Sequence, residues 1–176
     1  MSNPNGSSEA KGGELDEADT DLVIKLEAQE TRLVFDSFDH AAAWRLGTLM
    51  VERALLQEAP VIIDIRRPGL IQFRSALTGA TAENEAWLER KAHTVFRFET
   101  STELLRARFA TQGVDLWTAP WFDTQQYTAA GGSFPVRVHG VGVVAAVTVS
   151  GIDNDHDFLV ATLEAYIDRP PPPHGC

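Results

Sequence analysis

The chain has 176 residues, of which 44 % are apolar and 23 % are charged, and its formal net charge is −10. A chain of this length forms one domain whose core needs no disulfide or metal for folding. The negative charge argues against nucleic-acid binding, which needs a basic face, and no apolar run is long enough for a membrane-spanning helix. The single cysteine, Cys176, excludes a disulfide framework and a cysteine-rich metal site.

The two ends of the chain differ in composition from the rest. Residues 1–20 are rich in Ser, Asn, Gly, Asp and Glu, a composition that cannot bury enough apolar surface to become ordered. Residues 169–176 include a run of four prolines and are also expected to be disordered. We therefore predict one folded domain over residues 21–168. Because the acidic N-terminal segment lacks a basic-then-apolar signal pattern, we expect a cytoplasmic protein.

The periodicity of the apolar residues predicts the elements of this domain. Asp39 is the expected N-cap of a long helix, Pro68-Gly69 predicts a type II turn between two strands, and Thr100 with Glu103 resembles a capping box. In chain order we expect a helix over 22–28, a strand over 31–38, a helix over 39–57, strands over 61–65 and 70–77, helices over 82–97 and 100–111, a short helix over 123–129, strands over 134–139 and 141–150, and a helix over 155–168.

These strands come in hairpin pairs and not in alternating βαβ units. The order therefore predicts an α+β fold in which helices flank a central antiparallel sheet of about five strands. Between the predicted helices and the last hairpin lies an apolar loop over 114–122 that contains Trp117 and Trp121.

Motifs with a known chemical mechanism are mostly missing from the sequence. There is no phosphate-binding loop, and Gly140 to Ala145, which matches a loose dinucleotide fingerprint, opens a strand and is interpreted as a turn. The five histidines show no zinc-binding spacing, so no metal site is predicted, although His156 remains a candidate axial ligand for haem iron. The alternating acids at 153–157 lack the other ligands of a calcium loop, and helix capping is the interpretation adopted.

One region nevertheless suggests a pocket for an anionic ligand. Residues 66–108 hold eight basic and five acidic side chains, whereas the segments on both sides are acidic. Arg90 and Lys91 are adjacent on a predicted helix, and the small residues of 129–133 expose backbone donors. Trp87 and Tyr127 offer flat apolar walls. The alternative, that the glycines form a turn and the bases pair with neighbouring glutamates, stays open.

Three blocks of sequence carry a family resemblance. Asn84, Trp87, Arg90 and Lys91 stand at the spacing N-x-x-W-x-x-R-K, residues 127–136 read YTAAGGSFPV, and residues 140–151 contain GVG followed by VTVSG. Together they resemble the haem-degrading-domain family of GlcG-like and HbpS-like proteins, in its intracellular branch, over about residues 22–167. The histidine that this family usually has before Gly-Gly is replaced here by Ala130.

The resemblance implies a profilin-like α-β-α sandwich that assembles with itself into dimers or larger rings. It also implies a homo-oligomeric protein that binds haem or a similar anionic small ligand and assists haem degradation, although it leaves open whether the chain is an enzyme. Haem is thus the expected cofactor. The alternative function is a non-enzymatic assembly or chaperone-cofactor protein. The ligand-binding residues that we predict are Arg66, Asn84, Trp87, Arg90, Lys91, Tyr127, Gly131 and Gly132.

Overall fold

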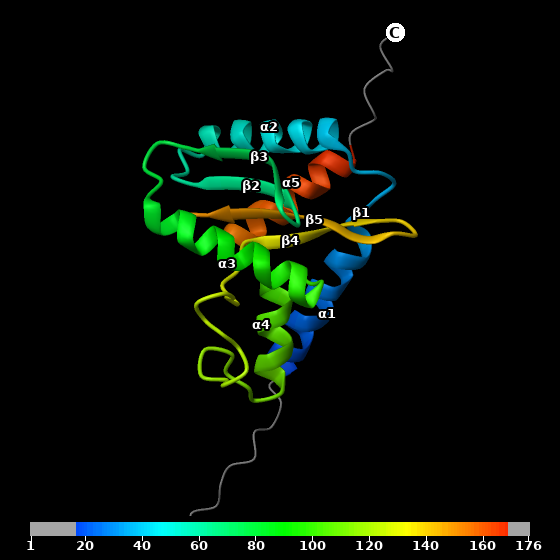
Figure 1. Ribbon diagram of the computed structural model, residues 1–176. Helices are drawn as coiled ribbons and strands as arrows, with labels where there is room; N and C mark the ends of the chain where they lie inside the picture. The colour runs from blue at the N-terminus through cyan, green and yellow to red at the C-terminus, as the bar shows by residue number, and fades with distance from the viewer. Residues whose placement is uncertain (1–16, 169–176) are drawn as a thin grey trace, which may run out of the picture.

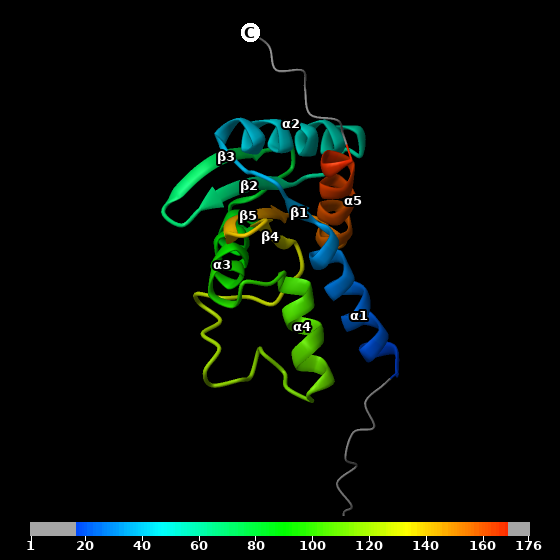
Figure 2. The ribbon, with the colours of Figure 1, turned by 90° about the vertical axis from the view of Figure 1, so that its right-hand side faces the viewer.

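The computed structural model describes residues 17–168, which form five helices and five strands in layers (Figure 1). The helices are α1 (Glu17–Arg32), α2 (His40–Leu56), α3 (Ala82–Phe98), α4 (Thr102–Thr111) and α5 (Asp155–Ile167). The strands are β1 (Val34–Phe35), β2 (Ile62–Arg67), β3 (Leu70–Ala76), β4 (Ser133–Val138) and β5 (Gly142–Ser150). Helices α2 and α5 cover one face of the sheet and α3 covers the other, while α1 packs against α4 (Figure 2).

The strands form one sheet in the order β1-β4-β5-β2-β3. The predicted α+β sandwich is confirmed, and the neighbours β4–β5, β5–β2 and β2–β3 are antiparallel. The sheet differs from the prediction at one edge, where β1 runs parallel to β4 with Val34 opposite Arg137. Since β1 and β4 are far apart in the chain, no hairpin turn fixes their relative direction.

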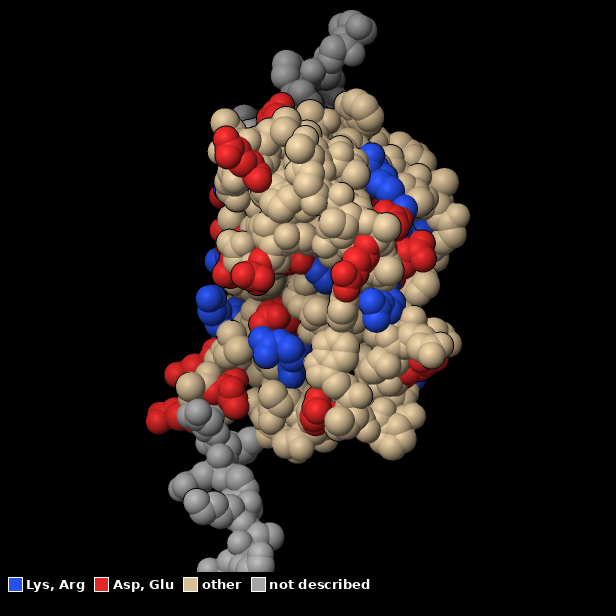
Figure 3. Space-filling view, turned by 90° about the vertical axis from the view of Figure 1, so that its left-hand side faces the viewer, with Lys and Arg blue, Asp and Glu red and all other residues tan. Residues whose placement is uncertain are grey.

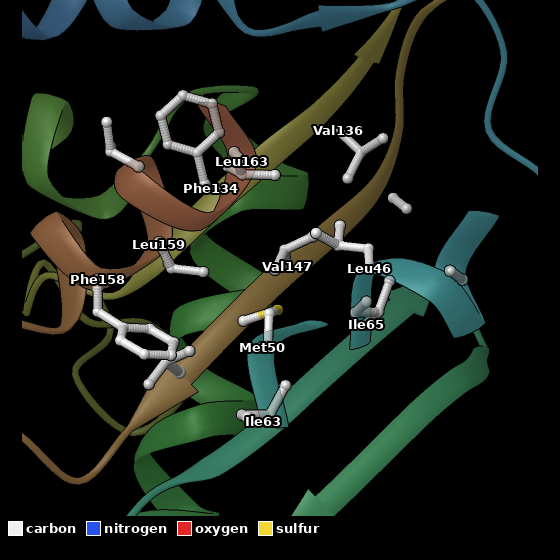
Figure 4. Packing of buried hydrophobic residues seen from close by; sticks show 14 of the residues in the cluster. Leu46, Met50, Ile63, Ile65, Phe134, Val136, Val147, Phe158, Leu159 and Leu163 are labelled. Carbon is white, nitrogen blue, oxygen red and sulfur yellow. The ribbon is translucent and has the colours of Figure 1, made fainter. Parts of the chain in front are cut away.

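The main core lies between the sheet and the pair α2 and α5. Alternate residues of β2, β4 and β5 point into it, because successive side chains of a strand face opposite sides. Each fully buried Leu, Ile or Phe contributes about 1.5–3 kcal/mol relative to exposure. The residues labelled in Figure 4 are members of this core, namely Leu46, Met50, Ile63, Ile65, Phe134, Val136, Val147, Phe158, Leu159 and Leu163.

The opposite face of the sheet, under α3, is much more polar. Asp64 of β2 has no exposed surface, and its carboxylate accepts hydrogen bonds from Arg66 Nε at 2.5 Å and Arg74 Nε at 2.9 Å. Two glutamates of α3 extend this network, since Glu85 pairs with Arg74 and Glu89 lies 3.7 Å from Arg66. The hydrogen bonds offset the cost of burying these charges between the sheet and α3.

The N-terminal part of the domain departs most from the sequence prediction. The helix expected over 22–28 is longer at both ends, because α1 begins at Glu17 and ends at Arg32. The strand expected over 31–38 shrinks to the two residues of β1. Residues 17–20 of the expected acidic tail therefore belong to α1, whereas the rest of that tail and the expected tail 169–176 lie outside the described residues.

Helix caps confirm one local prediction and correct another. The Asp39 side chain accepts a hydrogen bond from Ala42 N at 2.7 Å, as expected for the N-cap of α2. The capping box proposed for Thr100 is wrong, because Ser101 caps α4 and Thr100 Oγ1 donates to Glu30 Oε1 at 2.7 Å. The short helix expected over 123–129 is also wrong, because the Asp123 carboxylate accepts from the nearby Gln125 N and favours a turn.

Candidate functional site

A cleft of about 440 Å³ opens where α1, α4 and the N-terminus of α5 come together. Residues 130–131 and 152–157 complete its walls, and Lys91 reaches it from α3. This volume lies in the range of small-molecule sites, about 300–1,000 Å³. Basic and acidic side chains are intermixed on the surface shown in Figure 3, so neither sign of charge forms a large patch on that face.

A buried ion pair forms the inner wall of the cleft. Lys91 Nζ donates to Asp155 Oδ2 at 2.5 Å and to the carbonyl oxygen of Val149 at 2.9 Å. Only 2 % of Lys91 and 6 % of Asp155 is exposed. Burial lowers the pKa of Lys91 and raises the pKa of Asp155, while the charge of each partner opposes both shifts. The pair thus ties α3 to the end of β5 and the start of α5.

Two consecutive glycines form the adjoining wall. Gly132 has a φ of +110°, and a Cβ there would lie 2.6 Å from Asp155 Cβ and 2.7 Å from Val149 O. A Cβ at Gly131 would lie 2.8 Å from Glu103 Oε2. Only glycine at position 132 lets the backbone approach the ion pair this closely, so the Gly-Gly sequence follows from the packing of the site.

His156, the second residue of α5, is held by a contact from α1. Its Nε2 lies 3.0 Å from Gln29 Oε1, and its Nδ1 is buried with no hydrogen-bond partner among the described residues. Burial lowers the pKa of His156, against the raising effect of the acidic groups Glu103, Asp157 and Glu30. The neutral imidazole is therefore the favoured form near pH 7.

Two more basic residues line the outer part of the cleft, Lys25 of α1 and Arg106 of α4. Arg106 pairs with Glu103, three residues earlier on the same helix, and keeps about half of its side chain exposed. The α5 N-cap, Asn154, makes no side-chain capping hydrogen bond, so backbone N–H groups at this end keep hydrogen-bonding capacity. The acidic residues of the first turn, Asp155 and Asp157, partly balance the positive end of the helix.

The cleft brings together only some of the residues predicted from the sequence. Lys91, Gly131 and the candidate haem ligand His156 line it, and Gly132 lies directly behind them against Lys91 and Asp155. Ala130, which stands where the resembling family has histidine, is also part of the wall.

The other predicted ligand residues lie on the sheet side of α3 or at its margins. Arg66 belongs to the polar network with Asp64, and Asn84 completes the capping box of α3 with Thr81. Arg90 stacks over Trp87, with its guanidinium carbon 4.1 Å from the ring centroid, and donates to the Thr124 carbonyl.

Tyr127 also lies in a cluster outside the cleft. Its ring packs against Phe98 and Phe122, and the guanidinium carbon of Arg97 lies 4.6 Å from the Tyr127 ring centroid. The adjacent side chains of Arg90 and Lys91 therefore lie in different environments, because neighbouring residues of a helix point about 100° apart. Arg90 contacts Trp87 and Thr124, whereas Lys91 reaches the cleft.

Sequence reasoning missed Lys25, Gln29 and Arg106. The first two lie four residues apart on α1, a spacing that places both on one helix face. That spacing is the one signal in the sequence, but it points to a shared site only once α1 is known to pack against α4. Such a tertiary contact leaves no trace in local periodicity.

The comparisons with known proteins agree with this fold. Residues 38–164 match the family model described as haem degrading protein HbpS-like. The chain belongs to this HbpS-like family. Among its relatives is a UPF0303 protein of Streptomyces coelicolor, 47 % identical over 147 residues that cover 82 % of this chain and 93 % of that protein.

Solved structures share the fold of this HbpS-like chain. The crystal structure of the Ybr137w protein superposes with a TM-score of 0.74 at 28 % identity, covering 82 % of this chain and 86 % of that one. A structure entitled PduOC:heme complex superposes with a TM-score of 0.61 at 22 % identity, covering 77 % and 96 % of the two chains. Within residues 17–168, no helix is long and apolar enough to cross a membrane.

Proposed function

We propose that this protein is a homo-oligomer that binds haem, or a similar anionic small ligand, in the cleft between α1, α4 and α5. The observation that carries the proposal is a cleft of about 440 Å³ whose walls hold the basic side chains Lys25 and Arg106, beside the acidic Glu103, Asp153 and Asp157, together with a buried histidine. Membership of the HbpS-like family makes haem the first ligand to test. The haem complex of a protein with the same fold supports the same choice.

The side chains of the cleft fit the chemical groups of haem. Haem supplies an iron that takes an axial ligand, a flat apolar ring and two carboxylates. Imidazole is a side chain that binds such an iron, and His156 places one on the cleft wall with its Nδ1 buried. Leu22 and Ile152, both half-buried, offer apolar surface for a ring, and Lys25 and Arg106 offer cationic donors for carboxylates. Among the described residues no cluster of three His, Cys, Asp or Glu offers a competing metal site.

Lys25 and Arg106, in the outer part of the cleft, differ from Lys91 in how available their charge is to a ligand. Lys91 is held in the buried pair with Asp155, so it supports the wall of the cleft and has no free charge for a ligand. Arg106 is engaged by only one glutamate and is half-exposed, so it can turn from Glu103 to a ligand carboxylate. Lys25 has no ion-pair partner within 4.0 Å among the described residues, so its ammonium group is available to a ligand.

A hemin titration tests the proposal. Hemin added to the purified protein is expected to give a saturable Soret shift and to quench tryptophan fluorescence. Arg106→Gln should weaken binding about tenfold, the equivalent of one lost charge-assisted hydrogen bond of about 1.4 kcal/mol. The control is Arg108→Gln on the same helix, because Arg108 pairs with Glu27 outside the cleft. A wild-type protein without a saturable response, or an Arg106→Gln protein with wild-type affinity, would overturn the proposal.

One observation favours the second candidate, a non-enzymatic assembly protein. The loop between α4 and β4 is anchored by buried Leu116 and Phe122, yet it leaves Trp117 and Trp121 almost half exposed. Exposed indoles at neighbouring positions are typical of a surface that another chain covers. Light scattering of the double variant Trp117→Ser/Trp121→Ser tests this: a smaller assembly supports the loop as an interface, and an unchanged assembly removes it.

A further inference from the structure

One side of helix α2 is not covered by any other described element, because α2 is the outermost layer of the domain (Figures 1 and 2). Three large apolar side chains lie on it: Trp44 is 64 % exposed, Leu55 60 % and Leu56 87 %. With 3.6 residues per turn, these three positions fall within about 120° of the helix circumference. Scattered exposed apolar residues need no explanation, but a group on one face is typical of a surface that binds a partner. We call this surface the outer face of α2, and its residues are Ala41, Trp44, Arg45, Thr48, Glu52, Leu55 and Leu56.

Two opposite charges lie on the same face. Arg45 and Glu52 are both exposed, and neither forms an ion pair or a side-chain hydrogen bond within the part of the chain that the structure describes. They stand two helical turns apart, about 10 Å along the axis. Thr48, midway between them, needs no partner for its hydroxyl, which donates to the Trp44 carbonyl at 2.9 Å. The face thus carries one unpaired base and one unpaired acid on either side of a small residue.

This pattern is complementary to itself. When two copies of a helix pack antiparallel about a two-fold axis near Thr48, a residue before Thr48 on one copy faces a residue equally far after it on the other. Arg45 then lies beside Glu52 of the partner subunit, and by symmetry Glu52 lies beside the partner's Arg45. The same packing sets Leu55 against the partner's Ala41, whose small side chain leaves room for it.

We infer that the outer face of α2 is an interface with a second copy of this chain, packed antiparallel about a two-fold axis. The inference rests on the proposed self-assembly and gives it a surface, which is separate from the cleft and from the loop between α4 and β4. The two Arg45–Glu52 contacts determine the direction of packing, because parallel helices would bring Arg45 beside the partner's Arg45. The Trp44 indole is already oriented by the Phe73 ring, 5.7 Å away between centroids, so little freedom is lost when a partner covers it.

The C-terminal segment 169–176 of the same chain is a competing occupant of this face. It follows α5, whose Tyr166 hydroxyl donates to the Ala42 carbonyl at 3.4 Å, so it starts close to the beginning of α2. Its sequence, RPPPPHGC, contains a base that could meet Glu52 but no acidic side chain for Arg45. A second copy satisfies both charges, and the observations therefore favour it.

Sedimentation velocity and light scattering of the full chain test the pairing. In Arg45→Glu, both contacts of the two-fold pair bring two glutamates together, and in Glu52→Arg both bring two arginines together. Like charges that face each other at an interface oppose association. At concentrations where the wild type is assembled, each variant should have half its molar mass or less, with a dissociation constant raised at least tenfold. Glu83→Arg, an exposed charge reversal on α3, is the matched control and should keep the wild-type mass.

Two combinations of the variants distinguish direct pairing from other effects. The double variant Arg45→Glu/Glu52→Arg restores an acid opposite a base at both contacts, and its dissociation constant should lie within threefold of wild type. Mixing the two single variants should give a heterodimer, because each acid of one chain then meets a base of the other. Circular dichroism of all variants should match the wild type, since the substituted side chains are exposed and the reversed charges suit the helix dipole.

The possible failures point to different parts of the account. Wild-type assembly in Arg45→Glu, or single variants that stay apart when mixed, would overturn this interface and leave self-assembly to another surface. An assembly that is lost on removing residues 169–176 would also overturn it, in favour of the C-terminal segment. A wild-type chain that is monomeric at every concentration would instead overturn the proposed self-assembly itself.

Discussion

Replacing Lys91 by methionine should strongly destabilise the domain, because it leaves the buried carboxylate of Asp155 without its counter-charge. Asp155 is 6 % exposed and its Oδ2 lies 2.5 Å from Lys91 Nζ, so water cannot take the place of the ammonium group without opening the structure. The Val149 carbonyl loses its Lys91 donor as well. Breaking one side of such a pair costs about 3–5 kcal/mol.

Urea unfolding followed by tryptophan fluorescence measures this loss. With a slope of about 2 kcal/mol per molar urea, the Lys91→Met midpoint should fall by about 2 M. The matched variant is Lys91→Met/Asp155→Asn, which removes both charges while the asparagine can still accept from Ile152 N. Because no buried charge remains, the double variant should recover at least about 1 kcal/mol relative to Lys91→Met. A single-variant loss below about 1 kcal/mol, or a double variant less stable than Lys91→Met, would refute this account of the pair.

Three further predictions concern the walls of the cleft and its margin. Gly132→Ala should lower the free energy of unfolding, measured by urea denaturation, by more than about 2 kcal/mol, because a Cβ at this position would clash with its neighbours. Gly69→Ala should lower it by about 1 kcal/mol, because Gly69 has a φ of +75° but open space around it. Equal losses in the two variants would contradict the packing argument. The folded-state pKa of His156 lies below its ordinary value, so its stabilisation is present above about pH 6.5 and is lost as pH falls through the folded-state pKa. His156→Gln should flatten that part of the stability–pH curve, and an unchanged slope would show that the ring is not the group responsible. Asn84→Ala should cost about 1 kcal/mol through the lost cap and leave hemin affinity unchanged; a tenfold loss of affinity would return Asn84 to the binding site.

Local signals in the sequence were sufficient for most of the fold. Asp39 marks the start of α2 through its side-chain hydrogen bond, and Gly69, with a φ of +75°, marks the turn of the β2–β3 hairpin. Both depend on residues close in the chain, so they can be predicted from sequence. The predicted Thr100 cap is wrong because the Thr100 hydroxyl donates a hydrogen bond to Glu30, which belongs to another helix. The parallel pairing of β1 with β4 was not predicted for the same reason, because it depends on a contact between segments far apart in the chain.

The candidate site was predictable only in part. Lys91 and the two glycines stand out because their spacing resembles the HbpS-like family and because small residues permit close approach. Arg90 seemed to belong with Lys91, yet the helix turns it toward Trp87 and the Thr124 carbonyl. Gln29 carries no chemical signal of its own. Its role depends on α1 lying next to the start of α5, which only the three-dimensional structure establishes.

A crystal structure of the protein grown with hemin would test the central claim most directly. We expect one tetrapyrrole per chain in the cleft between α1, α4 and the start of α5, with a carboxylate on Arg106 or Lys25. A tetrapyrrole seated instead against the exposed Trp117 and Trp121 loop, with the cleft containing only water, would contradict it.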